Sequence, residues 1–483
     1  MVRLVNASAV GLSFDVEVDA PWDLAFDDTR ADALVTISAR SAAEAAPRTG
    51  VAEILIMDRS LSMAGRGKLA EAKRAMCAAI DTLHDGAYLG VIAGNHRAEV
   101  VYPPGGGLAR VDDETRAAAR RQVADQLPEG GTAIGSWLTC AERLFSSAAP
   151  GGTVRHAVLY TDGRDEHETG EQLTAALTAC TDRFVCDARG LGDDWDYAEL
   201  LRITEALHGG AEAVIDVADL TGDFTRLMRK AHGLVVPRVY LTLRLNDRFR
   251  VGFVRQTRPT EADLTAQQQP RGGEIHVPLG AWPPEVRQYQ LSLSFDADAL
   301  PVDEDLRAAR VGLHAETPGG SREPCAETRA MVVRRSGTPG LATVRPASLT
   351  RVENERELGM AMRACADAQR GGDPATANRE LRVALELAER LGDAVRLRLL
   401  RRVSAPGRDG VPALRPDVTR GEMQQLGLDS AKTGTAPADL IDPAPPADRT
   451  RVCRHCGATT SARVLRHCES CGRPFDDEVA DSP

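Results

Sequence analysis

Residues 51–62, VAEILIMDRSLS, decide the fold of this 483-residue chain. The first seven residues are mostly apolar, as expected of a strand that is covered on both faces of its sheet. The next five form a DxSxS sequence, in which Asp58, Ser60 and Ser62 offer only oxygen donors. In an open α/β sheet, ligands bind beyond the carboxyl ends of the strands. The stretch therefore predicts a central strand followed by a polar loop at the edge where ligands bind.

After this stretch the chain alternates between helical and extended patterns as far as about residue 232. Helices are predicted at 68–83, 112–127, 133–145, 170–180, 195–207 and 220–231. Strands are predicted at 88–93, 98–101, 156–160, 184–188 and 211–217. This alternation indicates a doubly wound α/β domain with a mainly parallel sheet over residues 49–233.

The flanking regions predict smaller modules. Alternating strands over residues 234–336 are typical of a β-sandwich, and we expect the N-terminal strands of residues 1–48 to be part of it. The α/β domain would then be inserted within the sandwich. Helical spacing over residues 350–405 predicts a helical hairpin or short bundle. Residues 406–450, rich in Pro, Gly, Asp and Thr, are predicted to be a disordered linker.

Composition narrows the class of protein. The net charge of −11 argues against a general nucleic-acid-binding surface, which needs clustered Lys and Arg. The N-terminus lacks a charged start followed by an apolar run, and no 18-residue apolar stretch occurs, so we expect neither a signal peptide nor a membrane span. Six cysteines are scattered singly, which favours free thiols over a disulfide such as Cys180–Cys186. A cytoplasmic location is expected.

Two further motifs add oxygen donors. GGTAIG, residues 130–135, places Thr132 at the start of a predicted helix, and HAVLYTDG, residues 156–163, places Asp162 at the end of a predicted strand. A DxSxS sequence alone is weak evidence, because Ser and Asp also favour loops and helix caps. The three motifs together suit a hard cation such as Mg²⁺, and Mn²⁺ is equally compatible.

The combination of DxSxS, GGT and TDG resembles the von Willebrand factor A (VWA) fold with its metal-ion-dependent adhesion site. The residues that match its side-chain ligands are Asp58, Ser60, Ser62, Thr132 and Asp162. The resemblance implies that the two serines bind the metal directly and the other three directly or through water. Stretches such as RHAVLYTDGRDEHET and CDARGLGDDW look like actinobacterial cytosolic VWA proteins, to about residue 435. Leu61 departs from the pattern, since many members have Gly there.

The resemblance also implies a function. In this family an Asp or Glu of a partner protein completes the metal's shell, and partners are thought to include phosphopeptide-reading domains, kinases or phosphatases. A non-enzymatic scaffold in signalling or complex assembly is therefore the leading hypothesis. An assembly subunit of a chelatase-like AAA+ ATPase machine is the first alternative. The residues Asp165, Glu166, His167 and Glu168 either tune the binding surface or form a solvated loop.

The C-terminal residues 451–475 predict a second metal site. Two CxxCG knuckles contribute Cys453, Cys456, Cys468 and Cys471, and four thiolates close a tetrahedral structural Zn²⁺ site. His455 and His467 are competing ligands that we consider less favoured. Five arginines make this zinc ribbon locally basic, so a nucleic-acid-associated factor acting through it is the second alternative. The acidic tail that follows offsets much of this positive charge.

The remaining sequence features give weaker evidence about function. No Ser-His-Asp set, paired catalytic carboxylates or HExxH motif can be placed, so we expect no enzyme. The histidines His84, His96 and His156 lack metal-ligand spacing and are expected on the surface or in packing. Thr433 and Thr435 are either phosphorylation sites or plain linker threonines.

Overall fold

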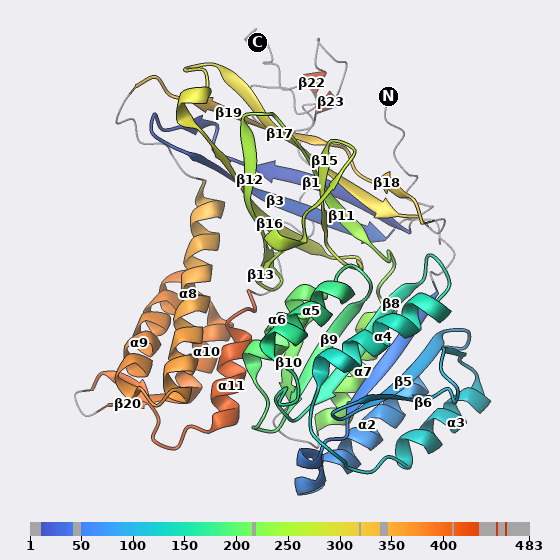
Figure 1. The fold of residues 1–483 in the computed structure, drawn as a ribbon. Helices are drawn as coiled ribbons and strands as arrows, with labels where there is room; N and C mark the ends of the chain where they lie inside the picture. Colours follow the sequence, from blue (N-terminus) through green and yellow to red (C-terminus); the bar gives the residue numbers. More distant parts are fainter. Residues whose placement is uncertain are drawn as a thin grey trace, which may run out of the picture.

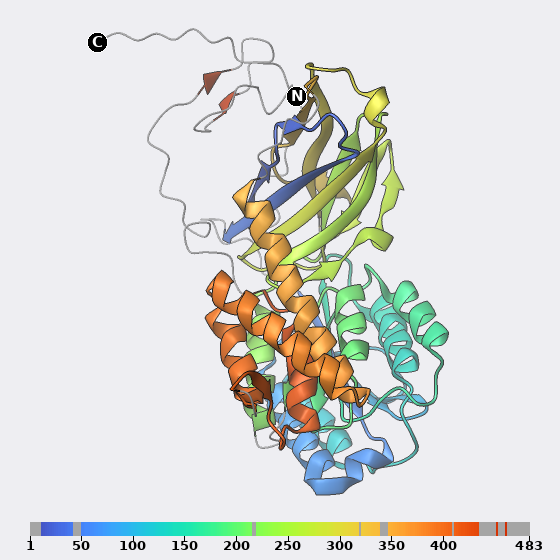
Figure 2. The ribbon, with the colours of Figure 1, turned by 90° about the vertical axis from the view of Figure 1, so that its left-hand side faces the viewer.

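The computed structural model describes residues 11–41, 50–214, 219–317, 320–338, 346–407, 410–433, 451–452 and 459–460. A β-sandwich lies at the top of Figure 1, an α/β domain below it, and a helical bundle beside the α/β domain. Figure 2 shows the long helix α8 (Ala347–Arg370) running from the sandwich down into the bundle.

The α/β domain is built on a seven-stranded sheet in the order β10-β9-β8-β4-β5-β6, with β7 also paired to β5. The parallel strands are β4 (Val51–Asp58), β5 (Tyr88–Gly94), β8 (Val154–Thr161), β9 (Val185–Leu191) and β10 (Ala211–Val214). The strands β6 (Ala98–Tyr102) and β7 (Ala109–Arg110) run antiparallel to β5. The predicted α/β fold is confirmed, and its sheet is mixed at one edge.

Helices cover both faces of this sheet, as the apolar sequence of β4 requires. Ile54 and Ile56 pack with one set of helices, whereas Leu55 and Met57 pack with the other, because successive side chains of a strand point to opposite faces. The first set is α4 (Ile134–Ala148), α5 (Gly170–Cys180) and α6 (Tyr197–Ala206). The second set is α2 (Lys68–Thr82), α3 (Asp113–Ala124) and α7 (Leu220–His232).

The β-sandwich consists of two sheets. The first has the order β1-β3-β16-β12-β13, from β1 (Leu12–Asp19), β3 (Arg30–Ser41), β16 (Val286–Phe295), β12 (Phe249–Arg258) and β13 (Ala262–Asp263). The second has the order β14-β15-β11-β17-β19-β2, with β18 paired to β17. Its strands are β14 (Gln269–Arg271), β15 (Glu274–Pro278), β11 (Val239–Leu245), β17 (Asp305–Glu316), β18 (Arg322–Pro324), β19 (Arg329–Arg335) and β2 (Asp23–Leu24). Because β3 pairs with β16, the α/β domain is inserted between strands of the sandwich.

The described residues of the C-terminal part form four helices. They are α8, α9 (Pro374–Leu391), α10 (Ala394–Val403) and α11 (Arg420–Asp429). The prediction of a disordered linker over residues 406–450 is wrong for residues 410–433. Strand β21 (Pro412–Leu414) pairs with β20 (Ser404–Pro406), and α11 begins at a capping box and buries apolar side chains in the core. The flanking Pro, Gly and Asp residues concealed this short, largely buried helix, because linker composition and helix caps use the same residues.

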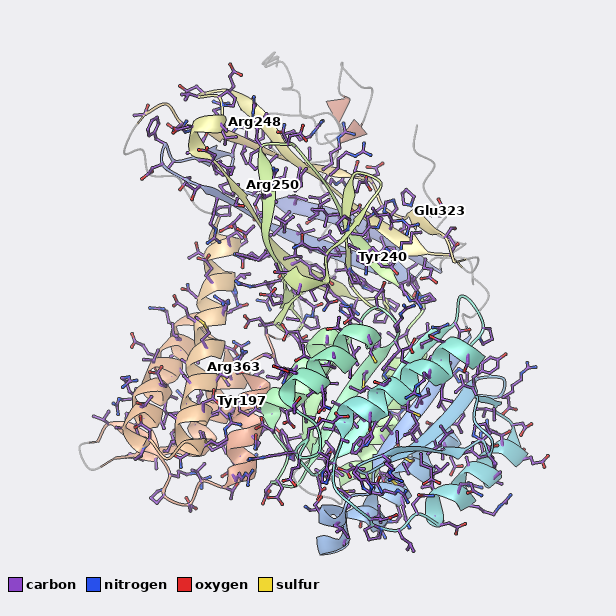
Figure 3. The ribbon with its side chains drawn as sticks, in the orientation of Figure 1. Tyr197, Tyr240, Arg248, Arg250, Glu323 and Arg363 are labelled. Atoms are coloured by element: carbon purple, nitrogen blue, oxygen red, sulfur yellow. The ribbon has the colours of Figure 1, made fainter. Side chains whose placement is uncertain are left out.

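Polar contacts tie the three units together. The Tyr197 hydroxyl, labelled in Figure 3, donates to Asp367 Oδ1 of α8 over 2.6 Å. The Tyr240 hydroxyl of the sandwich donates to Asp182 of the α/β domain. Thr433 donates its N–H to the carbonyl of Pro259 over 3.0 Å, so the segment after α11 lies against the sandwich.

The cysteines, the length of the helices and the C-terminal strands were also subjects of the sequence predictions. The single cysteines at 77, 140, 180, 186, 325 and 365 are free. Across the described ranges, every helix is too short or too polar to span a bilayer. Strands β22 (Arg451–Val452) and β23 (Thr459–Thr460) form a small antiparallel pair, whereas the four predicted zinc ligands, their neighbouring histidines and Thr435 lie outside the described residues.

Candidate metal centre

Three loops meet at the carboxyl edge of the α/β sheet. The DxSxS loop leaves β4 and enters the 3₁₀ turn η1 (Leu61–Gly67), and the TDG loop leaves β8. The GGT loop precedes α4, and its Gly130 carbonyl accepts the N–H of Leu61 over 2.9 Å. The Thr132 carbonyl accepts the N–H of His167 over 3.0 Å. Backbone hydrogen bonds thus hold the three motifs of the predicted site against one another.

The oxygen donors of these loops converge. Ser60 Oγ and Ser62 Oγ are 2.9 Å apart, and Ser62 Oγ donates to Asp162 Oδ1 over 2.6 Å. A methyl group built on Gly163 would lie 3.0 Å from Thr132 Oγ1, 3.6 Å from Ser62 Oγ and 3.9 Å from Asp58 Oδ2. The structure therefore brings all five predicted site residues together, and the position of Gly163 leaves the space between them open.

Asp58 is a carboxylate inside the protein. Its side chain is fully buried, and its two oxygens accept the Ser60 N–H over 2.7 Å and the Thr161 hydroxyl over 2.6 Å. Burial raises the pKa of Asp58 to about 6, because these neutral donors offset only part of the lost solvation. A buried anion of this kind is stabilised by a nearby cation.

Lys68 supplies one positive charge that the sequence did not reveal. It is the first residue of α2, and its Nζ lies 2.6 Å from Asp162 Oδ2 and 3.8 Å from Asp194 Oδ2. Its side chain is only 9% exposed. The buried groups of the site are thus two carboxylates and one ammonium, with a formal charge of −1. The sequence predicts a helix here from the spacing of apolar residues such as Leu69 and Ala72. This spacing does not predict which group the Lys68 side chain contacts.

The site opens into a depression of about 860 Å³. Leu61 stands on its rim with 63% of its surface exposed, and the rings of His96 and His167 are 6.1 Å apart. Arg420 at the start of α11 also lines it, so the helical bundle contributes to this surface. A ligand that reaches the site therefore meets apolar, imidazole, guanidinium and carboxylate groups.

The acidic loop 165–168 has two roles. Glu166 and His167 line the depression, in keeping with a tuning role. Glu168 instead accepts the N–H groups of Gly135 and Ser136 over 2.7 and 2.8 Å, at the N-terminus of α4 where backbone donors are free. Burial and the adjacent Glu168 raise the pKa of Asp165 to about 8.

The donor set fits a hard divalent cation. Carboxylate and hydroxyl oxygens are the ligands that Mg²⁺ and Mn²⁺ prefer, and the buried Asp58 needs positive charge. The residues that would hold such an ion are Asp58, Ser60, Ser62, Thr132 and Asp162. The open depression leaves room for a ligand from outside the chain.

A second buried cluster lies on the same strands, and sequence reasoning missed it. His156 Nδ1 is 2.8 Å from Glu53 Oε1, and His156 Nε2 is 3.0 Å from Asp187 Oδ2. Burial opposes a charged imidazole, but the two carboxylates more than compensate and raise the pKa of His156 to about 9. The expectation that His156 is a packing residue is thus refined, because it bridges three strands as a cation.

The comparisons with known proteins agree with this architecture. The sequence profile of the von Willebrand factor type A domain matches residues 52–213. The structure of a von Willebrand factor type A protein from Catenulispora acidiphila is 32% identical, with a TM-score of 0.81, over 90% of this chain and 99% of that one. The chain belongs to the von Willebrand factor type A family.

Two more distant relatives extend the comparison. The ArnB paralog VWA2 from Sulfolobus acidocaldarius is 14% identical with a TM-score of 0.57, over 88% of this chain and 99% of that one, so it shares the fold. An uncharacterized protein of Synechocystis sp. is 28% identical over 229 residues, which are 46% of this chain and 52% of that one. This chain thus spans about half the length of that curated relative.

Proposed function

We propose that this chain is a non-enzymatic, metal-dependent scaffold that captures an Asp or Glu of a partner protein at the VWA site. The observation that carries the proposal is the meeting of Ser62, Thr132 and Asp58 oxygens around Gly163, at the base of an open depression. A bound Mg²⁺ or Mn²⁺ would supply an open coordination position for the partner's carboxylate.

Charge gives a physical reason for an acidic partner. Lys68 already offsets one of the two buried carboxylates, so the protein groups carry a formal charge of −1. A divalent ion would change this to +1, in a depression where Arg164 and Arg420 balance Glu166 and Asp194. Opposite charges attract more strongly in such a partly desolvated site than in bulk water. The hydroxyl groups of the two serines and Thr132 are uncharged. The loaded site would therefore keep a net positive charge that attracts the partner's carboxylate.

We propose a cytoplasmic role in bacterial signalling or complex assembly for the whole chain. Its partners would be a kinase, a phosphatase, a phosphopeptide-reading protein or an AAA+ ATPase. The predicted zinc ribbon of residues 451–475 would dock a second protein. Support comes from the resemblance of the motifs and from the paired CxxCG knuckles in the sequence.

An affinity pull-down from native lysate tests the proposal. The three arms are wild type with Mg²⁺, wild type with EDTA, and Asp58→Ala with Mg²⁺. We expect the same partners to be lost in the second and third arms. The mutant is needed because EDTA also removes zinc from a ribbon. Equal partner recovery by wild type and Asp58→Ala would contradict metal-dependent capture.

A further inference from the structure

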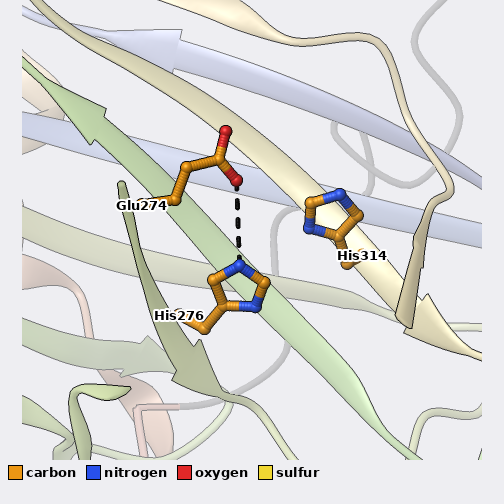
Figure 4. Close-up of side chains that lie close together, drawn as sticks. All are labelled: Glu274, His276 and His314. Carbon is orange, nitrogen blue, oxygen red and sulfur yellow. Dashed lines mark ion pairs between the residues drawn. The ribbon is translucent and has the colours of Figure 1, made fainter. Parts of the chain in front are cut away.

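A second group of metal-binding side chains lies on the sandwich, far from the VWA site. Glu274 and His276 are two residues apart on β15, so both side chains project from the same face of the sheet. His314 comes from β17, on the far side of β11. Figure 4 shows the three side chains gathered over this face. One ligand atom from each lies within 4.8 Å of the other two.

The strand register explains why the two imidazoles meet. His276 is opposite Thr242 of β11, and Thr242 is opposite Gly312 of β17. Gly312 has no side chain to fill this row, and a Cβ there would lie 2.8 Å from Thr242 Oγ1. His314, two residues further along β17, therefore reaches His276, and the rings stack with centroids 5.2 Å apart.

The imidazole nitrogens are not satisfied by the protein. His276 is only 5% exposed, and the Nδ1 atoms of both His276 and His314 are buried without a hydrogen-bond partner. His276 Nε2 lies 3.7 Å from Glu274 Oε2, beyond hydrogen-bond distance. Leaving a buried polar atom unpaired costs about 1–3 kcal/mol. An ion held between Glu274 and His276 Nε2 could satisfy the unpaired nitrogen of His314.

Burial disfavours a charge on either imidazole. Burial, His314 and Arg322 lower the pKa of His276 to about 4, and burial also lowers the pKa of His314. A neutral imidazole offers a lone pair on one nitrogen to a metal ion. Glu274 and Glu323 bring negative charge, and Arg271 and Arg322 bring positive charge.

Two arginines near the cluster, Arg322 and Arg244, have acidic partners of their own. The Arg322 guanidinium stacks 3.6 Å above the centroid of the Tyr240 ring. It also forms an ion pair with Asp182 at 3.3 Å, which balances its positive charge. Figure 3 labels Tyr240 and Glu323 near this end of the sandwich. The Glu274 carboxylate contacts Arg244 at 3.3 Å through Oε1, which leaves Oε2 facing His276.

We propose that Glu274, His276 and His314 bind a divalent transition-metal ion of the Zn²⁺ class. Two imidazoles and one carboxylate suit Zn²⁺, Co²⁺ or Ni²⁺, whereas Mg²⁺ prefers oxygen-only sites. With metal–nitrogen bonds of about 2.0–2.1 Å, tetrahedral donors are about 3.4 Å apart. Binding therefore draws the half-buried His314 ring toward His276, and water completes the shell. This site is independent of the VWA site and of the proposed partner capture.

The test is Zn²⁺ stoichiometry and affinity of the full chain, by equilibrium dialysis with elemental analysis. Wild type is compared with His276→Ala/His314→Ala, in the natural background and with Cys453→Ser/Cys456→Ser to disable the predicted ribbon. We expect the histidine variant to bind one equivalent less in both backgrounds. In the cysteine background, Co²⁺ should give d–d absorption bands without thiolate charge transfer, and these bands should disappear with the histidines.

Two further variants complete the experiment, one as a negative control and one as a conservative substitution in the site. His84→Ala changes an exposed histidine of the VWA domain and should leave Zn²⁺ binding unchanged. Glu274→Gln keeps the size of the side chain and should weaken the site at least about tenfold, and it decides the question if the double variant does not fold. Equal stoichiometry and affinity in the folded site variants and in wild type would overturn the proposal.

Discussion

Two buried polar clusters occupy opposite ends of the same two strands, β4 and β8. At one end, Glu53 of β4 and His156 of β8 meet Asp187 of β9. At the other end, Asp58 ends β4, and Asp162 directly follows β8 and pairs with Lys68. All six side chains are buried.

The clusters differ in how their hydrogen bonds and charges are completed. Both nitrogens of His156 face a carboxylate, and Asp187 also accepts the Gly210 N–H over 2.6 Å. The cluster of Asp58 instead adjoins the hydroxyls of Ser60 and Ser62, which line the open depression. One cluster is closed by protein groups, whereas the other faces solvent with oxygen donors. We therefore expect the His156 cluster to stabilise the fold and the Asp58 cluster to bind a metal ion.

Replacing His156 should have the largest effect on stability. In His156→Leu the carboxylates of Glu53 and Asp187 remain buried without their cation, and breaking such a pair costs about 3–5 kcal/mol. Urea unfolding measures the loss. The exposed His84→Leu is the control and should change stability by less than about 0.5 kcal/mol. A loss below about 1 kcal/mol for His156→Leu would show that the closed cluster contributes little.

Replacing Lys68 should destabilise the protein in a way that Mg²⁺ reverses. Lys68→Met leaves Asp162 buried without its ammonium, so we expect a loss of about 3 kcal/mol without Mg²⁺. The extra negative charge should also tighten Mg²⁺ binding by roughly tenfold. Lys73→Met, on the exposed side of the same helix, is the control. If Mg²⁺ stabilised the Lys68 variant no more than wild type, Lys68 would not share the metal's environment.

Raising the pH should weaken the closed cluster. The folded pKa of His156, about 9, lies above the ordinary value of 6.5, so the folded state binds the proton more tightly. Its stabilising contribution is complete below about pH 6.5 and is lost as the pH rises through about 9. We expect the unfolding free energy to fall by roughly 2 kcal/mol between pH 7 and 10. The same series on His156→Leu should show a smaller decline, and parallel curves would contradict the assignment.

The rim of the open cluster should affect partner binding alone. Leu61 is 63% exposed beside the two serines, so Leu61→Ala removes a contact surface without removing an oxygen. We expect partner affinity to fall by about 1 kcal/mol, roughly fivefold, with Mg²⁺ affinity unchanged. Calorimetry with Mg²⁺ and then with an isolated partner separates the effects. Weaker Mg²⁺ binding would mean that Leu61 shapes the metal loop itself.

The sequence predicted those features that depend on local patterns. The apolar run of β4 and the helix–strand alternation specify the α/β sheet, because their periodicity is set by the backbone. The loops with Asp58, Thr132 and Asp162 could be predicted to meet, because parallel strands end at one edge.

Features that depend on tertiary contacts could not be predicted in this way. The pairing of His156 with Glu53 depends on strand register, and the contact of Lys68 with Asp162 depends on where α2 packs. His276 and His314 meet only because β11 lies between their strands. Helix α11 was missed because its capping residues look like those of a linker.

The most direct test of metal binding at the open cluster compares Asp58→Asn with Glu53→Gln. Both substitutions remove the charge of a fully buried carboxylate on β4, at its two ends. Thermal unfolding is measured for each variant and for wild type, with and without Mg²⁺. We predict that Mg²⁺ raises the Tm of wild type and of Glu53→Gln but not of Asp58→Asn. An equal Mg²⁺ response in Asp58→Asn and wild type would contradict metal binding at this site.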